Sequence, residues 1–212
     1  MAQQNFDMSG IRLVEAFGFL SGWESVALSV FVKAILPAEA KIVNVGAGVG
    51  TSSLSMALAK NGIDITTVDI SIGGPLGGLE NERNAFKFSP YLPLPKQVLS
   101  DSYEAGKTWT GGLLDFVFID GDHLAAGLER DIVAWLPHIK EGGYIGFHDY
   151  DSDKWGDVKK TIDRYMNPAL FKKILHVDTI AIYQLIKPGS DIPVDILERP
   201  AETVKRKPVR KA

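Results

Sequence analysis

Short apolar runs alternate with stretches of helical spacing along most of the chain. Five of these runs, most of them rich in β-branched or aromatic residues, stand between turn signals, as is typical of buried strands. They are KIVNV, IDITTVDI, QVLSDS, LLDFVFID and GYIGFHDY. One segment between them carries Leu128, Ile132, Leu136 and Ile139 on one face, with Gly142-Gly143 as its predicted end. Strands that alternate with helices predict a doubly wound α/β fold with a mostly parallel sheet.

The two ends of the chain differ from this central pattern. FKKILHV and IAIYQLI are separated only by Asp178-Thr179, so they predict an antiparallel hairpin that completes a seven-stranded sheet. Within residues 1–37, residues 10–35 show helical spacing, whereas residues 188–212 contain repeated prolines and a basic end, KRKPVRKA. We therefore expect N-terminal helices, one domain over residues 38–187 and a flexible basic tail.

Composition and charge exclude several classes of function. Lys and Arg number 23, and Asp and Glu 26, which gives a net charge of -3 and no general attraction to nucleic acid or to an anionic membrane. The chain has no cysteine, which excludes disulfides, a thiolate nucleophile and Cys-based zinc sites. The first residues lack a signal-peptide pattern, and no stretch reaches about 18 uninterrupted apolar residues. We expect a cytoplasmic protein that does not act at a membrane.

A glycine-rich loop follows the first strand. Gly46, Gly48 and Gly50 lead directly to a helix that starts at Thr51. Such a loop lets a ligand approach the backbone, and the free N–H groups of the helix favour an electron-rich partner. The spacing departs from the dinucleotide fingerprint, because Thr51 stands where that fingerprint has Gly or Ala. A nicotinamide cofactor is therefore disfavoured.

Carboxylates end the next two strands. Asp69 follows the loop by about 20 residues, where a carboxylate can accept hydrogen bonds from both hydroxyls of a ribose. Asp101 and Ser102 end the third strand and are placed to contact an adenine. All three residue types also serve as ordinary caps and turn residues, so a purely structural role stays open.

Acidic and imidazole side chains follow the fourth and fifth strands. The fourth ends in Asp120-Gly121-Asp122-His123, and the fifth in His148-Asp149-Tyr150. Because adjacent parallel strands place their carboxyl ends side by side, these groups are expected to converge at the mouth of the cleft. Asp120 and Asp149 could hold Mg²⁺ or Mn²⁺, and His123 or His148 could accept a hydroxyl proton as a general base. Asp120 and Asp122 could instead cap a turn or a helix.

These motifs resemble the class I S-adenosylmethionine (SAM)-dependent methyltransferases over roughly residues 38 to 187, through VNVGAGVG, TTVDI and the terminal hairpin. FIDGDH and HDY at the fourth and fifth strand ends narrow the resemblance to the Methyltransferase-24-like branch. The resemblance implies a Rossmann-like methyltransferase fold with S-adenosyl-L-methionine as cofactor. The implied cofactor-binding residues are Asn44, Gly46, Gly48, Gly50, Thr51, Asp69, Asp101, Ser102 and Asp120, and the implied catalytic residues are His148, Asp120 and His123. The chain departs from the family at Asn44, where an acidic residue is usual.

The resemblance favours O-methylation of a small-molecule hydroxyl, with or without a divalent metal. Nucleic acid is disfavoured as the substrate, because the Asn/Asp-Pro-Pro-Tyr/Phe run typical of nucleobase amino-methylation does not follow the fourth strand. Two alternatives stay open: an NAD- or nucleotide-dependent enzyme on the same architecture, and a SAM-binding module without catalysis. The segment after the second strand could be a substrate lid or a loop packed on the core. The sequence leaves the oligomeric state open, including a homo-oligomer.

Overall fold

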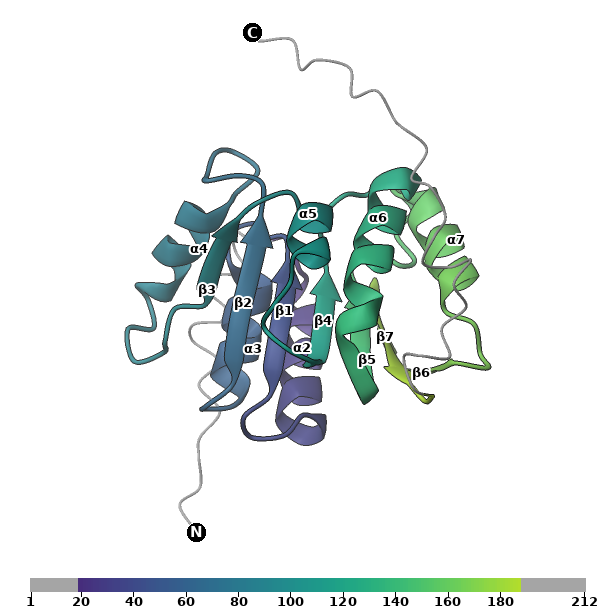
Figure 1. The fold of residues 1–212 in the computed structure, drawn as a ribbon. Helices are drawn as coiled ribbons and strands as arrows, with labels where there is room; N and C mark the ends of the chain where they lie inside the picture. The colour runs from purple at the N-terminus through teal and green to yellow at the C-terminus, as the bar shows by residue number, and fades with distance from the viewer. Residues whose placement is uncertain (1–18, 188–212) are drawn as a thin grey trace, which may run out of the picture.

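The computed structural model describes residues 19–187. In this part of the chain seven strands form one sheet in the order β3-β2-β1-β4-β5-β7-β6 (Figure 1). The strands are β1 (Lys41–Val45), β2 (Asp64–Asp69), β3 (Lys96–Leu99), β4 (Leu114–Ile119), β5 (Ile139–Phe147), β6 (Phe171–Val177) and β7 (Ile180–Leu185). β1 to β5 pair in parallel, and β7 runs antiparallel to both β5 and β6. The predicted doubly wound sheet with its terminal hairpin is confirmed.

Helices cover both faces of the sheet. They are α2 (Gly22–Ile35), α3 (Thr51–Ala59), α4 (Leu79–Phe86), α5 (Ser102–Lys107), α6 (Ala125–Trp135) and α7 (Gly156–Tyr165). One apolar cluster joins α2, α3 and α4 to one face, and a second cluster joins α6 and α7 to the other. In Figure 1, α5 and α6 lie in front of the sheet and α2 and α3 behind it. None of the described helices is long and apolar enough to cross a membrane.

The central strand β4 explains why its sequence is a continuous apolar run. Phe116 and Phe118 belong to one apolar cluster, whereas Val117 and Ile119 belong to the other. Successive strand residues point to opposite faces, and both faces are covered by helices, so every position of β4 is buried. The strand order therefore places β4 and β1 at the middle of the molecule, with their carboxyl ends adjacent.

The predicted end of the helix before β5 is wrong. α6 ends at Trp135, a short 3-10 helix (Leu136–His138) follows, and β5 already begins at Ile139. Pro137 accounts for the early end, because proline has no N–H to donate and its ring clashes with the preceding turn. The predicted first N-terminal helix and the tail of residues 188–212 lie outside the described residues.

Candidate active site

The glycine loop lies at the carboxyl end of β1, and its three glycines differ in what surrounds them. Gly46, Gly48 and Gly50 all have positive φ, at 90°, 49° and 89°. A Cβ at Gly46 would overlap the carbonyl oxygen of Asp120, and one at Gly50 would lie 3.0 Å from α4. A Cβ at Gly48 would meet nothing closer than Phe19, at 3.8 Å. Only Gly48 therefore combines a left-handed backbone with space in which a ligand could approach.

Asn44 holds the glycine loop from beneath. It is fully buried, its Nδ2 donates to the carbonyl oxygen of Gly46 at 3.0 Å, and its Oδ1 accepts from the Ser52 hydroxyl at 3.2 Å. An amide can make both contacts at once, whereas a carboxylate could only accept. The departure from the family pattern at this position thus fits a loop-holding role.

The start of α3 has unmet hydrogen-bonding capacity. Gly50 provides no side-chain cap, so the first N–H groups of the helix have no partner from its side chain. The buried hydroxyl of Thr51 likewise has no hydrogen-bond partner among the described residues. This end of α3 suits the polar end of a bound ligand.

Asp69 ends β2 beside the loop. Its Oδ2 accepts from the backbone N–H of Ala47 and its Oδ1 from that of Ser71, both at 2.7 Å. Each carboxylate oxygen can accept more than one hydrogen bond, so the predicted ribose contact is compatible with these two. The segment that follows Asp69 packs on the loop, since the N–H of Gly78 donates to the carbonyl oxygen of Gly48 at 2.7 Å.

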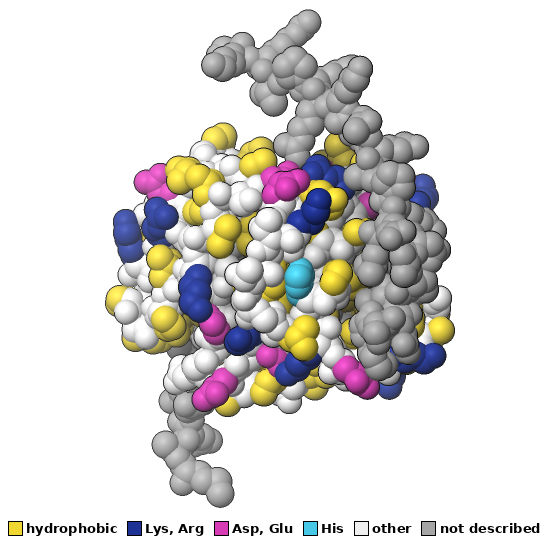
Figure 2. All heavy atoms as spheres, viewed as in Figure 1, with side chains coloured by type: hydrophobic (Ala, Val, Ile, Leu, Met, Phe, Trp, Pro, Cys, Tyr) yellow, Lys and Arg dark blue, Asp and Glu magenta, His cyan; other side chains and the backbone are white. Residues whose placement is uncertain are grey.

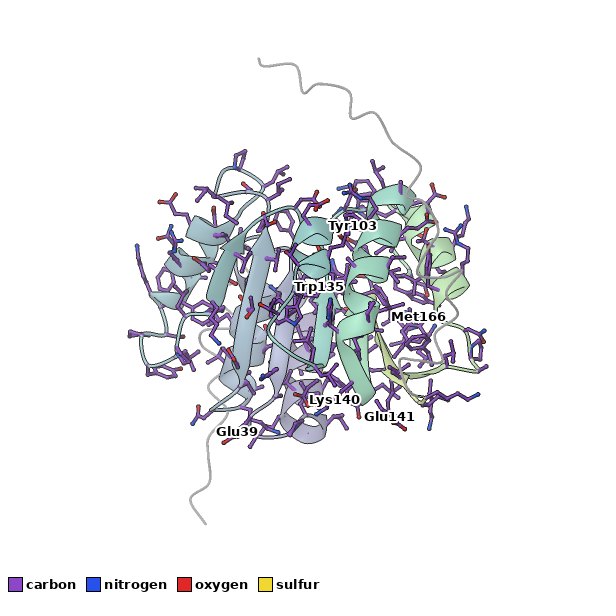
Figure 3. The ribbon with its side chains drawn as sticks, in the orientation of Figure 1. Glu39, Tyr103, Trp135, Lys140, Glu141 and Met166 are labelled. Atoms are coloured by element: carbon purple, nitrogen blue, oxygen red, sulfur yellow. The ribbon has the colours of Figure 1, made fainter. Side chains whose placement is uncertain are left out.

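Asp101 and Ser102 are occupied by local structure. Asp101 caps α5, with its side chain accepting from the N–H groups of Tyr103 and Glu104. Ser102 accepts from the Trp135 indole at 2.9 Å. Figure 3 shows Tyr103 at the edge of the sheet where the strands of this site end, with Trp135 between the helices and the sheet. The alternative that these residues act as caps and anchors therefore has direct support.

Asp120, His123 and Asp149 converge as predicted. One ligand atom from each lies within 4.8 Å of the others. His123 Nε2 is 2.8 Å from Asp149 Oδ2, and the His123 ring stacks on Trp155 at 4.7 Å between centroids. The hydrogen bond with Asp149, although opposed by burial, raises the pKa of His123 above its ordinary value of 6.5. Asp122 takes no part, because its Oδ1 accepts from the N–H of Leu124 as a local cap.

His148 lies deeper, between carboxylates. Its Nδ1 is 3.1 Å from Asp120 Oδ1 and 3.2 Å from Asp149 Oδ2, and its Nε2 is 3.4 Å from Glu24 Oε2. Burial favours neutral imidazole, but the charge and hydrogen bond of Asp120, with further hydrogen bonds from Asp149 and Glu24, raise the pKa of His148 to about 12. An imidazolium with both nitrogens engaged has no lone pair for a proton. This arrangement argues against the prediction that His148 is a general base.

Glu24 is the site residue that the sequence reasoning missed. It is 3% exposed, and burial, which raises its pKa, is outweighed by hydrogen bonds with His148, Thr179 and Ser21 that hold the pKa at about 2. The local signal was the capping box that Ser21 and Glu24 form at the start of α2. That signal assigns Glu24 to a helix end only, and nothing local connects it with His148.

Comparisons with known proteins bear on this geometry. A family model described as "Methyltransferase domain" matches residues 43–150, just over half of the chain. No curated protein sequence matches significantly. Among solved structures, an O-methyltransferase from Bacillus cereus in complex with SAH matches with a TM-score of 0.65 and 14% identity, over 88% of this chain and 93% of that one.

Two further structures share the fold. The cofactor-bound protein Rv0187 from MTB matches with a TM-score of 0.62 and 17% identity, over 77% of this chain and 79% of that one. An rRNA methylase from Streptococcus thermophilus matches with a TM-score of 0.57 and 12% identity, over 75% and 94%. Identities this low show a common fold, while the family model covers the glycine loop and both strand-end motifs. The chain therefore belongs to this methyltransferase-domain family and is a class I SAM-dependent methyltransferase.

Proposed function

We propose that the chain transfers the methyl group of SAM to a hydroxyl of a small molecule, with His123 as the general base and Asp149 as the residue that orients it. The observation that carries this proposal is the 2.8 Å contact between His123 Nε2 and Asp149 Oδ2. A base held by a carboxylate keeps one nitrogen bonded and the other free for a proton. The His123 side chain is 34% exposed, so a substrate can reach it, in contrast to His148 at 7%.

The donor would bind along the carboxyl ends of β1, β2 and β3. The open side of Gly48 and the uncapped start of α3 would receive its methionine portion, and Asp69 would accept the ribose hydroxyls. Asp101 would lie near the adenine as part of the α5 start. The SAH bound to the structurally similar Bacillus cereus enzyme supports this choice of cofactor.

The chemical step balances with these groups. The hydroxyl oxygen attacks the methyl carbon, the carbon–sulfur bond breaks, and its electron pair stays on sulfur, which changes from a sulfonium cation to a neutral thioether. The hydroxyl proton moves to Nδ1 of His123, and the carboxylate of Asp149 stabilises the resulting imidazolium. The charged His148, which also contacts Asp120, holds Asp149 in place and exchanges no proton in this step.

The charges at the site favour a small molecule over a nucleic acid. Asp120, Asp149 and the buried Glu24 surround the single positive charge of His148, so the reactive end keeps a net negative charge, which would repel a phosphate backbone. On the face drawn in Figure 2, the Lys and Arg side chains of the described residues are interspersed with acidic and apolar ones and form no continuous basic patch. A nucleic-acid substrate would call for such a patch.

A divalent metal is a second candidate for activating the hydroxyl, favoured by the cluster of Asp120, His123 and Asp149. Two carboxylates and an imidazole fit Mn²⁺ better than Mg²⁺, which prefers oxygen ligands throughout. Bound there, the metal would lower the pKa of the acceptor hydroxyl. His123 would then be a ligand and not the base, so the two candidates can be distinguished.

Calorimetric titration with SAH, in the presence of Mn²⁺ or of EDTA, tests the cofactor, with NAD and Asp69→Ala as controls. Micromolar binding that Asp69→Ala weakens supports the donor site. Binding of NAD instead of SAH would contradict the proposal and leave the NAD-dependent alternative. SAH binding without turnover on any hydroxyl acceptor would favour the non-catalytic module.

A screen of phenols, sugars and other hydroxyl compounds, read by SAH release, tests the chemistry. His123→Gln should lower the rate at least 10-fold, while His176→Gln, an identical change at an exposed position of β6, should not. If EDTA abolishes transfer and Mn²⁺ restores it, the metal-assisted alternative replaces the base. Full activity of His123→Gln in EDTA would refute both.

A further inference from the structure

We propose that Glu24, on the N-terminal helix α2, is a positioning residue of this active site that fixes His148 and, through it, the carboxylates Asp120 and Asp149. The inference rests on the proposed function, because it concerns the same reactive cluster. Glu24 lies 124 residues before His148, on a helix that precedes the whole parallel sheet. It touches none of the proposed reacting atoms and is therefore a positioning residue and not a catalytic one.

The contacts of Glu24 exceed what a helix cap requires. A capping box needs only its contact with Ser21, whose N–H donates to Oε2 at 2.7 Å. Glu24 Oε1 in addition accepts from the N–H and the hydroxyl of Thr179, at 3.0 and 2.5 Å, in the turn between β6 and β7. With His148 on Oε2, the carboxylate joins α2 to the turn before β7 and to the end of β5.

The contact between Glu24 and His148 also fixes the positions of the carboxylates at the reactive end. The imidazole ring is rigid, so a partner on Nε2 sets the direction of Nδ1 on the other side of the ring. Nδ1 of His148 faces Asp120 Oδ1 and Asp149 Oδ2 at nearly equal distances, 3.1 and 3.2 Å. Asp149 in turn holds His123, and its backbone φ of 58° needs support from its surroundings. Glu24, His148, Asp149 and His123 thus form one continuous chain of contacts.

The burial of Glu24 and His148 indicates that their contact is a built feature of the site. Glu24 is 3% exposed and His148 is 9% exposed. Desolvating a carboxylate and an imidazolium is costly unless each finds partners, and here both have several. A carboxylate needed only to start a helix does not require this burial, since the capping box depends only on its contact with Ser21.

Glu24→Gln is the informative variant, because it keeps the size of the side chain and an oxygen that can accept from Thr179. The amide nitrogen cannot accept from His148, so the ring loses its anchor. A misplacement of about 1 Å at a reacting group costs on the order of 100-fold in rate. We expect kcat to fall by about 10- to 100-fold, with the Kd for SAH and the KM for the acceptor within about 2-fold of wild type.

Ser21→Ala is the matched control. It removes the Ser21 hydroxyl, which caps α2 and donates to Asp178 Oδ2 at 2.7 Å, but it leaves the contact between Glu24 and His148. It should lower Tm with kcat unchanged. If both variants lose kcat in proportion to their loss of Tm, or if Glu24→Gln keeps the wild-type kcat, Glu24 is only a helix anchor and the proposal is wrong.

The crystal structure of full-length Glu24→Gln decides the matter independently of turnover. We expect His148 Nδ1 to lose its contact with Asp120 or Asp149 in this variant. Unchanged contacts would overturn the positioning role. If the wild-type protein neither binds SAH nor transfers a methyl group, those assays refute the proposed function. The crystallographic comparison still tests whether Glu24 positions His148.

Discussion

Replacing Gly46 with alanine should destabilise the protein much more than the same change at Gly48, although both glycines belong to one loop. Both residues have positive φ, and an alanine in that region costs roughly 1–2 kcal/mol. At Gly46 the new methyl would also overlap the carbonyl oxygen of Asp120, a backbone atom that cannot move without distorting β4. Such overpacking adds about 1–3 kcal/mol.

The expected totals are therefore about 2–5 kcal/mol at Gly46 and about 1–2 kcal/mol at Gly48. Binding should show a different pattern. The methyl at Gly48 would occupy the open side of the loop, 3.8 Å from Phe19, where the proposed cofactor approaches. We expect the Gly48 variant to remain folded, with the loss of about 1–2 kcal/mol stated above, and to lose at least about 10-fold in SAH affinity, because a methyl excludes a closely packed ligand.

Urea unfolding followed by tryptophan fluorescence measures the first quantity, and calorimetry with SAH the second. A chain of this size loses about 2–4 °C in Tm per kcal/mol, so thermal denaturation provides an independent check. Equal destabilisation by the two variants would refute the argument that the Asp120 carbonyl requires a glycine at position 46. Wild-type SAH affinity in the Gly48 variant would show that the cofactor does not approach from that side.

Two further predictions follow from buried or strand-end carboxylates. Asp69→Asn should lower SAH affinity by about 10- to 100-fold, since each hydrogen bond to a charged group contributes about 1.5–3 kcal/mol, and calorimetry measures the loss; unchanged affinity would remove Asp69 from the site. Burial, reinforced by the charge of Asp101 and Asp122 and opposed by a hydrogen bond from Ser102, raises the pKa of Asp131 from 3.8 to about 7. A raised acid pKa means that the folded state binds a proton that the unfolded chain releases, so stability falls as pH rises from about 4 to about 7. Asp131→Asn should therefore gain up to roughly 4 kcal/mol over wild type at pH 8 and little at pH 4 in urea unfolding, and an equal difference at both pH values would refute the argument.

The fold could be predicted because its signals are local. Apolar runs located the strands, and the short Asp178-Thr179 connection allowed only an antiparallel hairpin. Helical spacing located α6 and α7, whereas α4 lies in the segment after β2 that was expected to be a lid or a loop. The incorrect helix end, at Trp135, had its own local signal in Pro137, which the apolar spacing of Leu136 and Ile139 outweighed. The conflict between the apolar spacing and Pro137 is resolved by the pairing of β5 with β4, and this pairing cannot be read from the sequence.

Some features of the candidate site could likewise be predicted from local sequence signals, and others could not. Sequence alone determined that Asp69, Asp120 and Asp149 end strands, and the parallel arrangement then requires their side chains to lie along one edge of the sheet. Only the tertiary structure decided which histidine is accessible and which is enclosed by carboxylates. His123 and His148 both follow a strand end, but His148 lies between Asp120, Asp149 and the distant Glu24, whereas His123 contacts Asp149 at its exposed side. Glu24 is separated from His148 by 124 residues, and the energies of desolvation and hydrogen bonding depend on that distant contact and not on any local pattern.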